Sequence, residues 1–247
     1  MKKVLLSVLA LSAVAASQAV VVISEDFDQA QYVVGQNFVD NGTLLTSQPT
    51  IDWTSTATNT TSWKINNNHF VSAGKSVHVT GSSGTWAWPN GAPTVFAGDI
   101  WIASVKVRVD STAPVSNRSG LDVWGASNLG GLAIRSDGTV ATSTTGTWST
   151  VAGFTAASNT WHEVKLVMAY TSATTGTMQR YLNGVAVGTP TVLSSAFTDA
   201  DLYASTGGAL SRNVNFDDYK LEVVPEPATM AALGLGLATV ARRRKSK

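Results

Sequence analysis

The sequence has no cysteine, only three histidines, and few charged side chains, which make up 13% of its 247 residues. Without cysteine the chain forms neither a disulfide framework nor a thiolate nucleophile, so its stability must come from a packed core or from bound metal. The histidines show no zinc-type spacing, and no glycine-rich loop suited to phosphate occurs. These absences leave strand packing and oxygen-based sites as the features to examine.

The C-terminal stretch 224–247 differs in composition from everything before it. It contains a proline-rich motif (Val224, Pro225, Glu226 and Pro227), an apolar run (228–241) and a basic end (242–247). Proline lacks an N–H and restricts its neighbour, so the folded body should stop at the motif. The 14-residue run predicts a short apolar helix, below the roughly 20 residues that span a bilayer. Basic side chains are retained on the cytoplasmic side of a membrane, so we expect the C-terminal end to stay there. The residues concerned are Arg242, Arg243, Arg244 and Lys245.

This order of motif, apolar helix and basic end resembles the PEP-CTERM sorting tail of exported bacterial proteins. The resemblance implies recognition by an exosortase-type membrane enzyme and cleavage near the prolines. It also implies transient anchoring in the inner membrane, followed by release or attachment at the cell surface. The alternative is a plain C-terminal membrane anchor.

The first 19 residues have the pattern of a secretory signal peptide. Lys2 and Lys3 precede an apolar core, and small residues flank Gln18, so we expect signal peptidase to cleave after Ala19. The mature body is then 20–223, a length that fits one all-β domain. Removing seven targeting cations and Glu226 from 17 basic and 16 acidic residues leaves 10 against 15, or −5. That charge argues against nucleic acid as a partner and leaves neutral sugars, cations and proteins.

Period-2 alternation predicts β-strands along the body. The clearest are Trp101–Val109 and His162–Tyr170. Shorter candidates are Val20–Phe27, Ser76–Thr80, Gly131–Arg135, Gln179–Leu182 and Val214–Val223. Turn signals separate strands at Asn41-Gly42, Asp137-Gly138 and Asn183-Gly184. Many short strands without a convincing amphipathic helix predict a two-sheet antiparallel sandwich.

Two local motifs indicate which kind of β-sandwich the chain forms. Trp161-His162 opens one strand, and Tyr181-Leu182-Asn183-Gly184 follows as a hairpin. Together with the Gly131–Val140 hairpin they resemble the concanavalin A-like, laminin-G-type jelly roll. The resemblance implies the fold, whose functions range from sugar binding to adhesion to hydrolysis, so the fold alone does not decide the function.

Hydrolysis on such a fold would need paired carboxylates on one face. The glucanase members of the superfamily carry Glu-x-Asp-x-x-Glu, and this sequence has no such string. The nearest acidic run, at Glu25, Asp26 and Asp28, belongs to the N-terminal edge. We therefore expect a non-enzymatic protein, with a polysaccharide-degrading enzyme as the alternative.

A calcium site is a further candidate. The apolar face of the last strand slips by one residue at Asp217 and Asp218, which predicts a β-bulge that aims both carboxylates outward. If the first and last strands pair, Glu25 or Asp26 comes close to them, and oxygen ligands suit structural calcium. The alternative is a solvated acidic edge that discourages sheet aggregation.

The eight tryptophans suggest a sugar-binding surface. Alternation places Trp86 and Trp88 on one face, where they could stack on sugar rings while Asn90 supplies hydrogen bonds. Trp124 and Trp148 are weaker candidates. The alternative is that these aromatics only cover the end of the sandwich. The sequence thus predicts an exported protein that binds extracellular polysaccharide or serves structurally, with protein adhesion as a third possibility.

Overall fold

The computed structural model describes most of the body and leaves both targeting segments outside the described residues. The described ranges are 18–29, 32–38, 53–55, 62–67, 70, 74–80, 85–91, 93–113, 116–205 and 213–225. The signal-peptide core, the expected turn at Asn41-Gly42, the apolar run and the basic end therefore lie outside them, as does His69.

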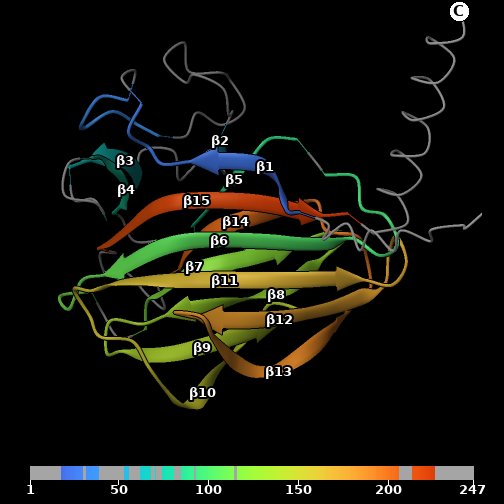
Figure 1. Ribbon diagram of the computed structural model, residues 1–247. Helices are drawn as coiled ribbons and strands as arrows, with labels where there is room; N and C mark the ends of the chain where they lie inside the picture. The colour runs from blue at the N-terminus through green and yellow to red at the C-terminus, as the bar shows by residue number, and fades with distance from the viewer. Residues whose placement is uncertain are drawn as a thin grey trace, which may run out of the picture.

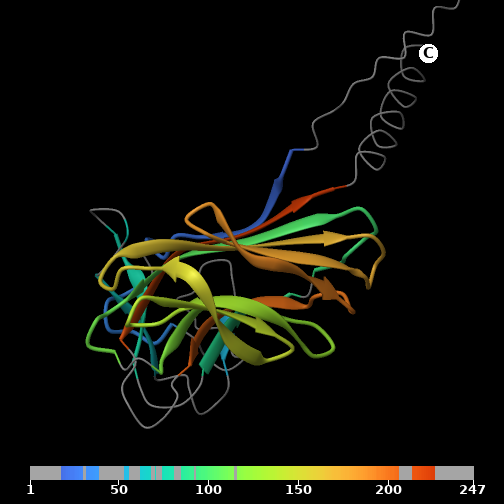
Figure 2. The same ribbon diagram turned by 90° about the horizontal axis from the view of Figure 1, so that it is seen from below.

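Two antiparallel sheets pack face to face, as Figures 1 and 2 show. Sheet A has the strand order β13-β12-β11-β6-β15-β4-β3, with β1 paired to β15. Its strands are β1 (Val20–Glu25), β3 (Trp63–Asn66), β4 (Ser76–Val79), β6 (Ile100–Val109), β11 (Trp161–Tyr170), β12 (Gly176–Leu182), β13 (Val185–Leu193) and β15 (Val214–Val224). Sheet B has the order β10-β9-β8-β7-β14-β5-β2. Its strands are β2 (Trp53–Ser55), β5 (Thr85–Pro89), β7 (Arg118–Trp124), β8 (Asn128–Ile134), β9 (Thr139–Thr144), β10 (Thr147–Thr155) and β14 (Asp199–Ser205).

Alternation builds the core between the sheets. In β6 and β11 every second residue is buried, so one face of each strand packs inward and the other faces solvent. From sheet B, Leu121 and Leu202 enter the same core. This confirms the predicted jelly-roll sandwich.

Two local predictions are confirmed. The turn at Asn183-Gly184 joins β12 to β13 with φ angles of 50° and 80°, the left-handed conformation that a two-residue hairpin requires. The first and last strands pair, with Val20 opposite Val223 and Glu25 opposite Tyr219.

Candidate functional site

The outer face of sheet B, turned away from sheet A, carries acidic and aromatic side chains from four strands. Because Leu121 and Leu202 face the core, their neighbours Asp122 and Asp201 face outward. The register places these two aspartates directly opposite each other on β7 and β14. On the same face, Tyr203 lies opposite Trp86 of β5.

Sheet B curls strongly around this face. The strands β14 and β10 are four places apart in the sheet, about 19 Å at the usual spacing of ~4.8 Å. Nevertheless, the rings of Tyr203 and Trp148 stack with centroids 4.9 Å apart and planes 5° apart. A flat sheet could not bring them together, so the outer face is concave and the two rings bridge its centre.

The floor under this bridge is built from small residues on β7, β8 and β9. They are Gly120, Gly131, Ala133, Ala141 and Ser143. At Gly131 a Cβ atom would lie 2.2 Å from the Leu121 carbonyl and 2.9 Å from Asp122 Oδ1. Small side chains therefore leave room for the aromatic rings above them and for the aspartates beside them.

The aromatic rings form a continuous row above the aspartates. Trp86 contacts Tyr203 at 5.6 Å and meets Trp124 edge to face at 6.1 Å. With Trp148 on Tyr203, the aromatic row is Trp124, Trp86, Tyr203 and Trp148. Apolar ring surface thus covers carboxylates that would otherwise be hydrated.

The two aspartates are almost completely buried, with exposures of 1% for Asp122 and 3% for Asp201. Asp122 Oδ2 accepts hydrogen bonds from Asn128 Nδ2 at 2.6 Å and Trp86 Nε1 at 3.3 Å. The Oδ1 atom of each aspartate has no hydrogen-bond partner among the described residues. Both atoms are buried, so each aspartate carries an oxygen that is neither hydrated nor hydrogen-bonded to the described residues.

Burial raises the pKa of both groups. Desolvation raises the pKa of Asp122 to about 6, against the opposing hydrogen bonds from Trp86 and Asn128. Burial, followed by the hydrogen bond and charge of Asp199, raises the pKa of Asp201 well above its usual value. Strongly perturbed carboxyls in a concave, aromatic-lined surface are typical of a functional site.

A cavity of about 430 Å³ opens beside the pair. Its volume falls within the usual range of small-molecule sites, roughly 300–1,000 Å³. The described residues that line it are Trp86, Trp88, Trp124, Gly125, Thr198, Asp199 and Asp201. Asp201 thus faces the cavity. Trp86 belongs both to the cavity wall and to the aromatic row, which continues from it through Tyr203 to Trp148.

A buried arginine from the other sheet supports this floor. Arg180 of β12 crosses the core and is 1% exposed. Its Nε donates to the Gly131 carbonyl at 2.8 Å and its Nη2 to the Ser143 carbonyl at 2.5 Å. Burial lowers the pKa of the guanidinium to about 10, while the charge of Asp122 acts in the opposite direction. Arg180 therefore joins β8 to β9 beneath the aspartates.

The sequence-predicted sugar-binding residues lie partly within this site. Trp86 and Trp88 share one face, as alternation predicted, and both line the cavity. Asn90 instead donates from Nδ2 to Thr54 Oγ1 at 2.7 Å. Sequence reasoning missed Asp122, Asp201 and Tyr203, although Asp199, Asp201 and Tyr203 do alternate with Ala200 and Leu202.

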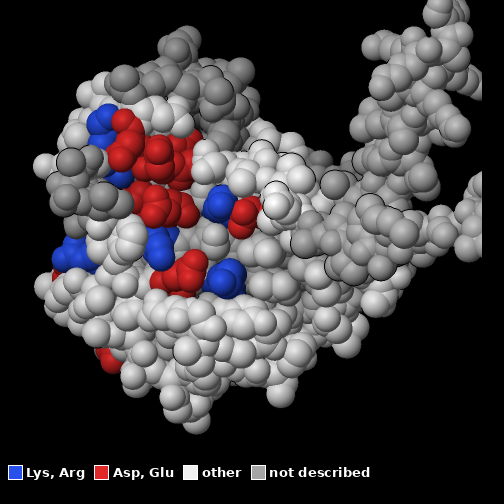
Figure 3. All heavy atoms as spheres, viewed as in Figure 1, with Lys and Arg blue, Asp and Glu red and all other residues white. Residues whose placement is uncertain are grey.

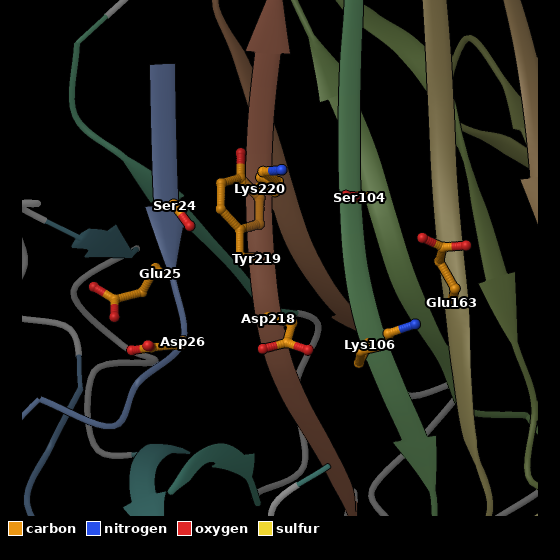
Figure 4. Close-up of a pocket in the computed structure, with 9 residues that line it drawn as sticks. All are labelled: Ser24, Glu25, Asp26, Ser104, Lys106, Glu163, Asp218, Tyr219 and Lys220. Atoms are coloured by element: carbon orange, nitrogen blue, oxygen red, sulfur yellow. The ribbon is translucent and has the colours of Figure 1, made fainter. Parts of the chain in front are cut away.

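The predicted calcium residues belong to the other side of the molecule, in an acidic patch seen on sheet A in Figure 3. The predicted bulge is present: the register shifts after Asp217, and Asp218 has a φ of 48°. Asp26 and Asp218 line one pocket together with Glu25, as Figure 4 shows.

Two of the four predicted calcium ligands, Glu25 and Asp217, accept hydrogen bonds from protein donors. Glu25 accepts from Phe27 N and Gln29 through Oε1 and from Tyr32 through Oε2, so it points away from β15 (Figure 4). Asp217 accepts from the backbone N–H groups of Phe70 and Asp218. Among the described residues no group of three acidic or histidine side chains is arranged to hold a metal ion. The calcium site stays a prediction.

The sorting motif begins where the last strand ends. Val224 closes β15 and Pro225 follows it, whereas Glu226, Pro227 and the basic end lie outside the described residues. Within the described ranges no helix is long and apolar enough to span a bilayer. The signal peptide and the membrane-spanning helix therefore stay predictions.

Comparison with known proteins identifies the tail and the fold. Residues 223–245 match the PEP-CTERM protein-sorting motif, so the chain is an exported protein processed by an exosortase-type enzyme and held transiently in a membrane. No curated protein sequence matches significantly.

Several solved structures share the jelly-roll fold. An endo-1,3-β-glucanase from Streptomyces sioyaensis aligns with a TM-score of 0.55 at 12% identity, covering 84% of this chain and 97% of that one. A double mutant of the alginate lyase Aly36B, in complex with alginate trisaccharide, gives 0.51 at 13% identity, with coverages of 80% and 97%. An endo-β-1,4-glucuronan lyase from the fungus Trichoderma reesei gives 0.50 at 11% identity, with coverages of 82% and 95%. At such identities the likeness establishes the fold alone.

These findings correct the expectation of a non-enzymatic protein. The solved structures that share this fold include a glucanase and two lyases. The expectation rested on the lack of paired carboxylates along one strand, whereas Asp122 and Asp201 pair across two strands.

Proposed function

We propose that the protein acts on an extracellular polysaccharide, which it binds on the outer face of sheet B. The observation that carries this proposal is the cavity where Trp86, Trp88 and Trp124 line the walls together with the carboxyl groups of Asp199 and Asp201. Indole faces stack on the C–H faces of sugar rings, and carboxyl groups form hydrogen bonds with sugar hydroxyls. A concave site with aromatic walls and few convergent polar groups suits such a ligand. Export through the sorting tail would bring the site to polysaccharides outside the cell.

Binding is tested with Trp86→Ala and Trp124→Ala in calorimetric titrations against neutral and uronic-acid oligosaccharides. We expect each variant to lose at least tenfold in affinity. Trp161→Ala is a matched control, because this half-buried indole faces outward from sheet A and packs edge to face on Phe70. If both cavity variants bind as tightly as the control, the binding site lies elsewhere.

The carboxylate pair favours a second function, cleavage of the bound polysaccharide. Residues directly opposite on antiparallel strands have Cβ atoms about 4.5–5.5 Å apart, so Asp122 and Asp201 can act on one bond. The more strongly perturbed Asp201 would be protonated and donate a proton to a departing glycosidic oxygen. Asp122, with a pKa of about 6, would be mainly ionised at neutral pH and serve as base or nucleophile.

Cleavage is tested by following new chain ends in polysaccharide digests. We expect Asp122→Asn and Asp201→Asn each to lower the rate by about 10²- to 10⁴-fold while oligosaccharide affinity changes little. Products that contain an unsaturated sugar would assign the pair to elimination rather than hydrolysis. Unchanged rates in both variants would exclude the pair from catalysis and leave the binding proposal intact.

A further inference from the structure

The two ends of the described body meet at one end of the sandwich. β1 begins at Val20 beside Val223, and β15 ends at Val224 beside Ile100 of β6 (Figures 1 and 2). The signal peptide would precede Val20, and the sorting motif follows β15. Both targeting segments therefore join the body at the same place.

This end exposes large apolar side chains. Val20, Val21 and Val22 are 51%, 47% and 48% exposed, Ile100 is 37% exposed, and Phe96 is 63% exposed. Phe96 lies in the turn just before β6, where its carbonyl accepts from Asp99 N. We call these five residues the apolar end. They are half of the ten exposed large hydrophobic residues found in the described part of the chain.

The tail can separate this end from a membrane by only a short distance. The apolar run begins at residue 228, three residues after Pro225, the last described residue. A fully extended chain covers at most about 3.6 Å per residue, so the reach of these three residues is about 11 Å. Because the match at 223–245 makes the protein transiently membrane-held, the apolar end must stay close to the lipid surface during that stage.

We propose that the apolar end rests on the lipid surface while the tail is anchored, with Phe96 and the valines of β1 among the headgroups. Removing apolar side chains from water favours this contact. A short tether gives an effective concentration in the millimolar range, so weak lipid affinity is enough. The contact would orient the body and hold the junction at Pro225 at the level where a membrane enzyme acts.

The lack of cysteine allows a direct test, since one introduced thiol provides a unique label. The full chain carrying Phe96→Cys is labelled with a polarity-sensitive fluorophore. It is then reconstituted in phosphatidylethanolamine–phosphatidylglycerol vesicles that contain nitroxide lipids. The matched control is Val185→Cys, which is 59% exposed at the opposite end of sheet A, where β12 turns into β13. A third single-cysteine variant, Leu235→Cys, reports insertion of the tail. The measurements are made under reconstitution conditions in which its label is quenched.

We expect the label at residue 96 to be quenched at least twofold more than the label at 185, with a blue-shifted emission. Equal, weak quenching at both positions would overturn the proposal. A blue shift without nitroxide quenching would also overturn it, because the contact would then be with protein. Val22→Cys repeats the measurement if Phe96→Cys lowers the melting temperature.

Discussion

The two outer faces of the sandwich use charge in opposite ways. On sheet A, Lys106, Glu163 and Lys220 line open pockets, and Lys220 pairs with Glu222 at 3.0 Å. On sheet B, Asp122 and Asp201 lie beneath aromatic rings at exposures of 1% and 3%. Water and opposite charges stabilise the first set, whereas burial disfavours ionisation in the second. The visible concentration of charge in Figure 3 therefore does not mark the candidate catalytic face. Burial of a carboxyl alone does not mark it either, since Asp217 on sheet A is 3% exposed. The face is marked by two paired, buried carboxyls beside a cavity with aromatic walls.

The largest contrast in stability should come from two cations of sheet A, Arg180, which reaches through the core to the floor of sheet B, and Lys220, which lies on the outer face. Arg180→Met leaves the carbonyls of Gly131 and Ser143 without their donor in the core. We expect unfolding free energy to fall by about 3 kcal/mol, measured by urea denaturation. Lys220→Met removes an exposed cation and should change it by less than about 0.5 kcal/mol. Equal effects would mean that Arg180 does not support the floor.

The pH dependence of stability should next reveal the buried carboxyls, which occur on both faces, since burial raises the pKa of Asp122 on sheet B and that of Asp217 on sheet A. The folded-state pKa of Asp122 is raised from 3.8 to about 6, so the folded state binds more protons than the unfolded state between these values. Stability is then highest below pH 4 and falls as the pH rises through 6, by up to about 3 kcal/mol from this group. The raised pKa of Asp201 acts in the same direction. Asp122→Asn should flatten the decline in urea denaturation measured from pH 4 to 7.

Asp110 serves as a control, because its contribution to stability depends on pH in the opposite direction. Hydrogen bonds from the backbone and hydroxyl of Thr112 lower its pKa, so its contribution is present above the unfolded value and is lost as the pH falls. Asp110→Asn should therefore lower stability above about pH 4 and leave it little changed at lower pH, where the contribution of Asp110 is already lost. If Asp122→Asn has the same effect as Asp110→Asn, the pKa of Asp122 is not raised.

The aromatic bridge gives a smaller effect. Trp148→Ala removes the ring stacked on Tyr203, so we expect a loss of about 1 kcal/mol in stability. Without the bridge the concave floor is open along its length, and binding should shift towards longer oligosaccharides. Calorimetry with a length series checks this, with Trp161→Ala as the control. An unchanged length preference would show that the bridge does not limit access.

The smallest effect is expected from the ion pair on sheet A. Glu222→Gln breaks the contact with Lys220, whose side chain is 41% exposed. Such pairs contribute about 0–1 kcal/mol, and less at high salt. Thermal melts at low and high salt should differ little from those of the unchanged protein. A change in polysaccharide binding would refute the assignment of binding to sheet B.

The sequence pattern predicted those strands that have one face in the core and the other face in water. β6 and β11 alternate cleanly because their outer residues are solvated. The bulge was readable because Asp217 and Asp218 interrupt that alternation. β7 and β8 are buried on both faces and show no polar period. β7 was therefore missed, and β8 was predicted only over its second half, at Gly131–Arg135, next to the turn signal at Asp137-Gly138.

The candidate site was harder to predict because it depends on register. Asp122 and Asp201 are 79 positions apart (201 − 122), and neither lies in a recognisable acidic motif. Only the pairing of β7 with β14 brings them together. The contact between Trp148 and Tyr203 depends further on the curl of sheet B, which no local pattern encodes. The pair Trp86 and Trp88 was accessible because both lie on one strand.

The position of β15 has a mechanical consequence. The tail continues from a strand bonded along one side to β6 and along the other to β1 and β4. Drag on the body of a protein held by its tail would pull along β15 and load these hydrogen bonds together in shear. The lifetime of the fold under flow would then be set by its unfolding rate under force rather than by its equilibrium stability.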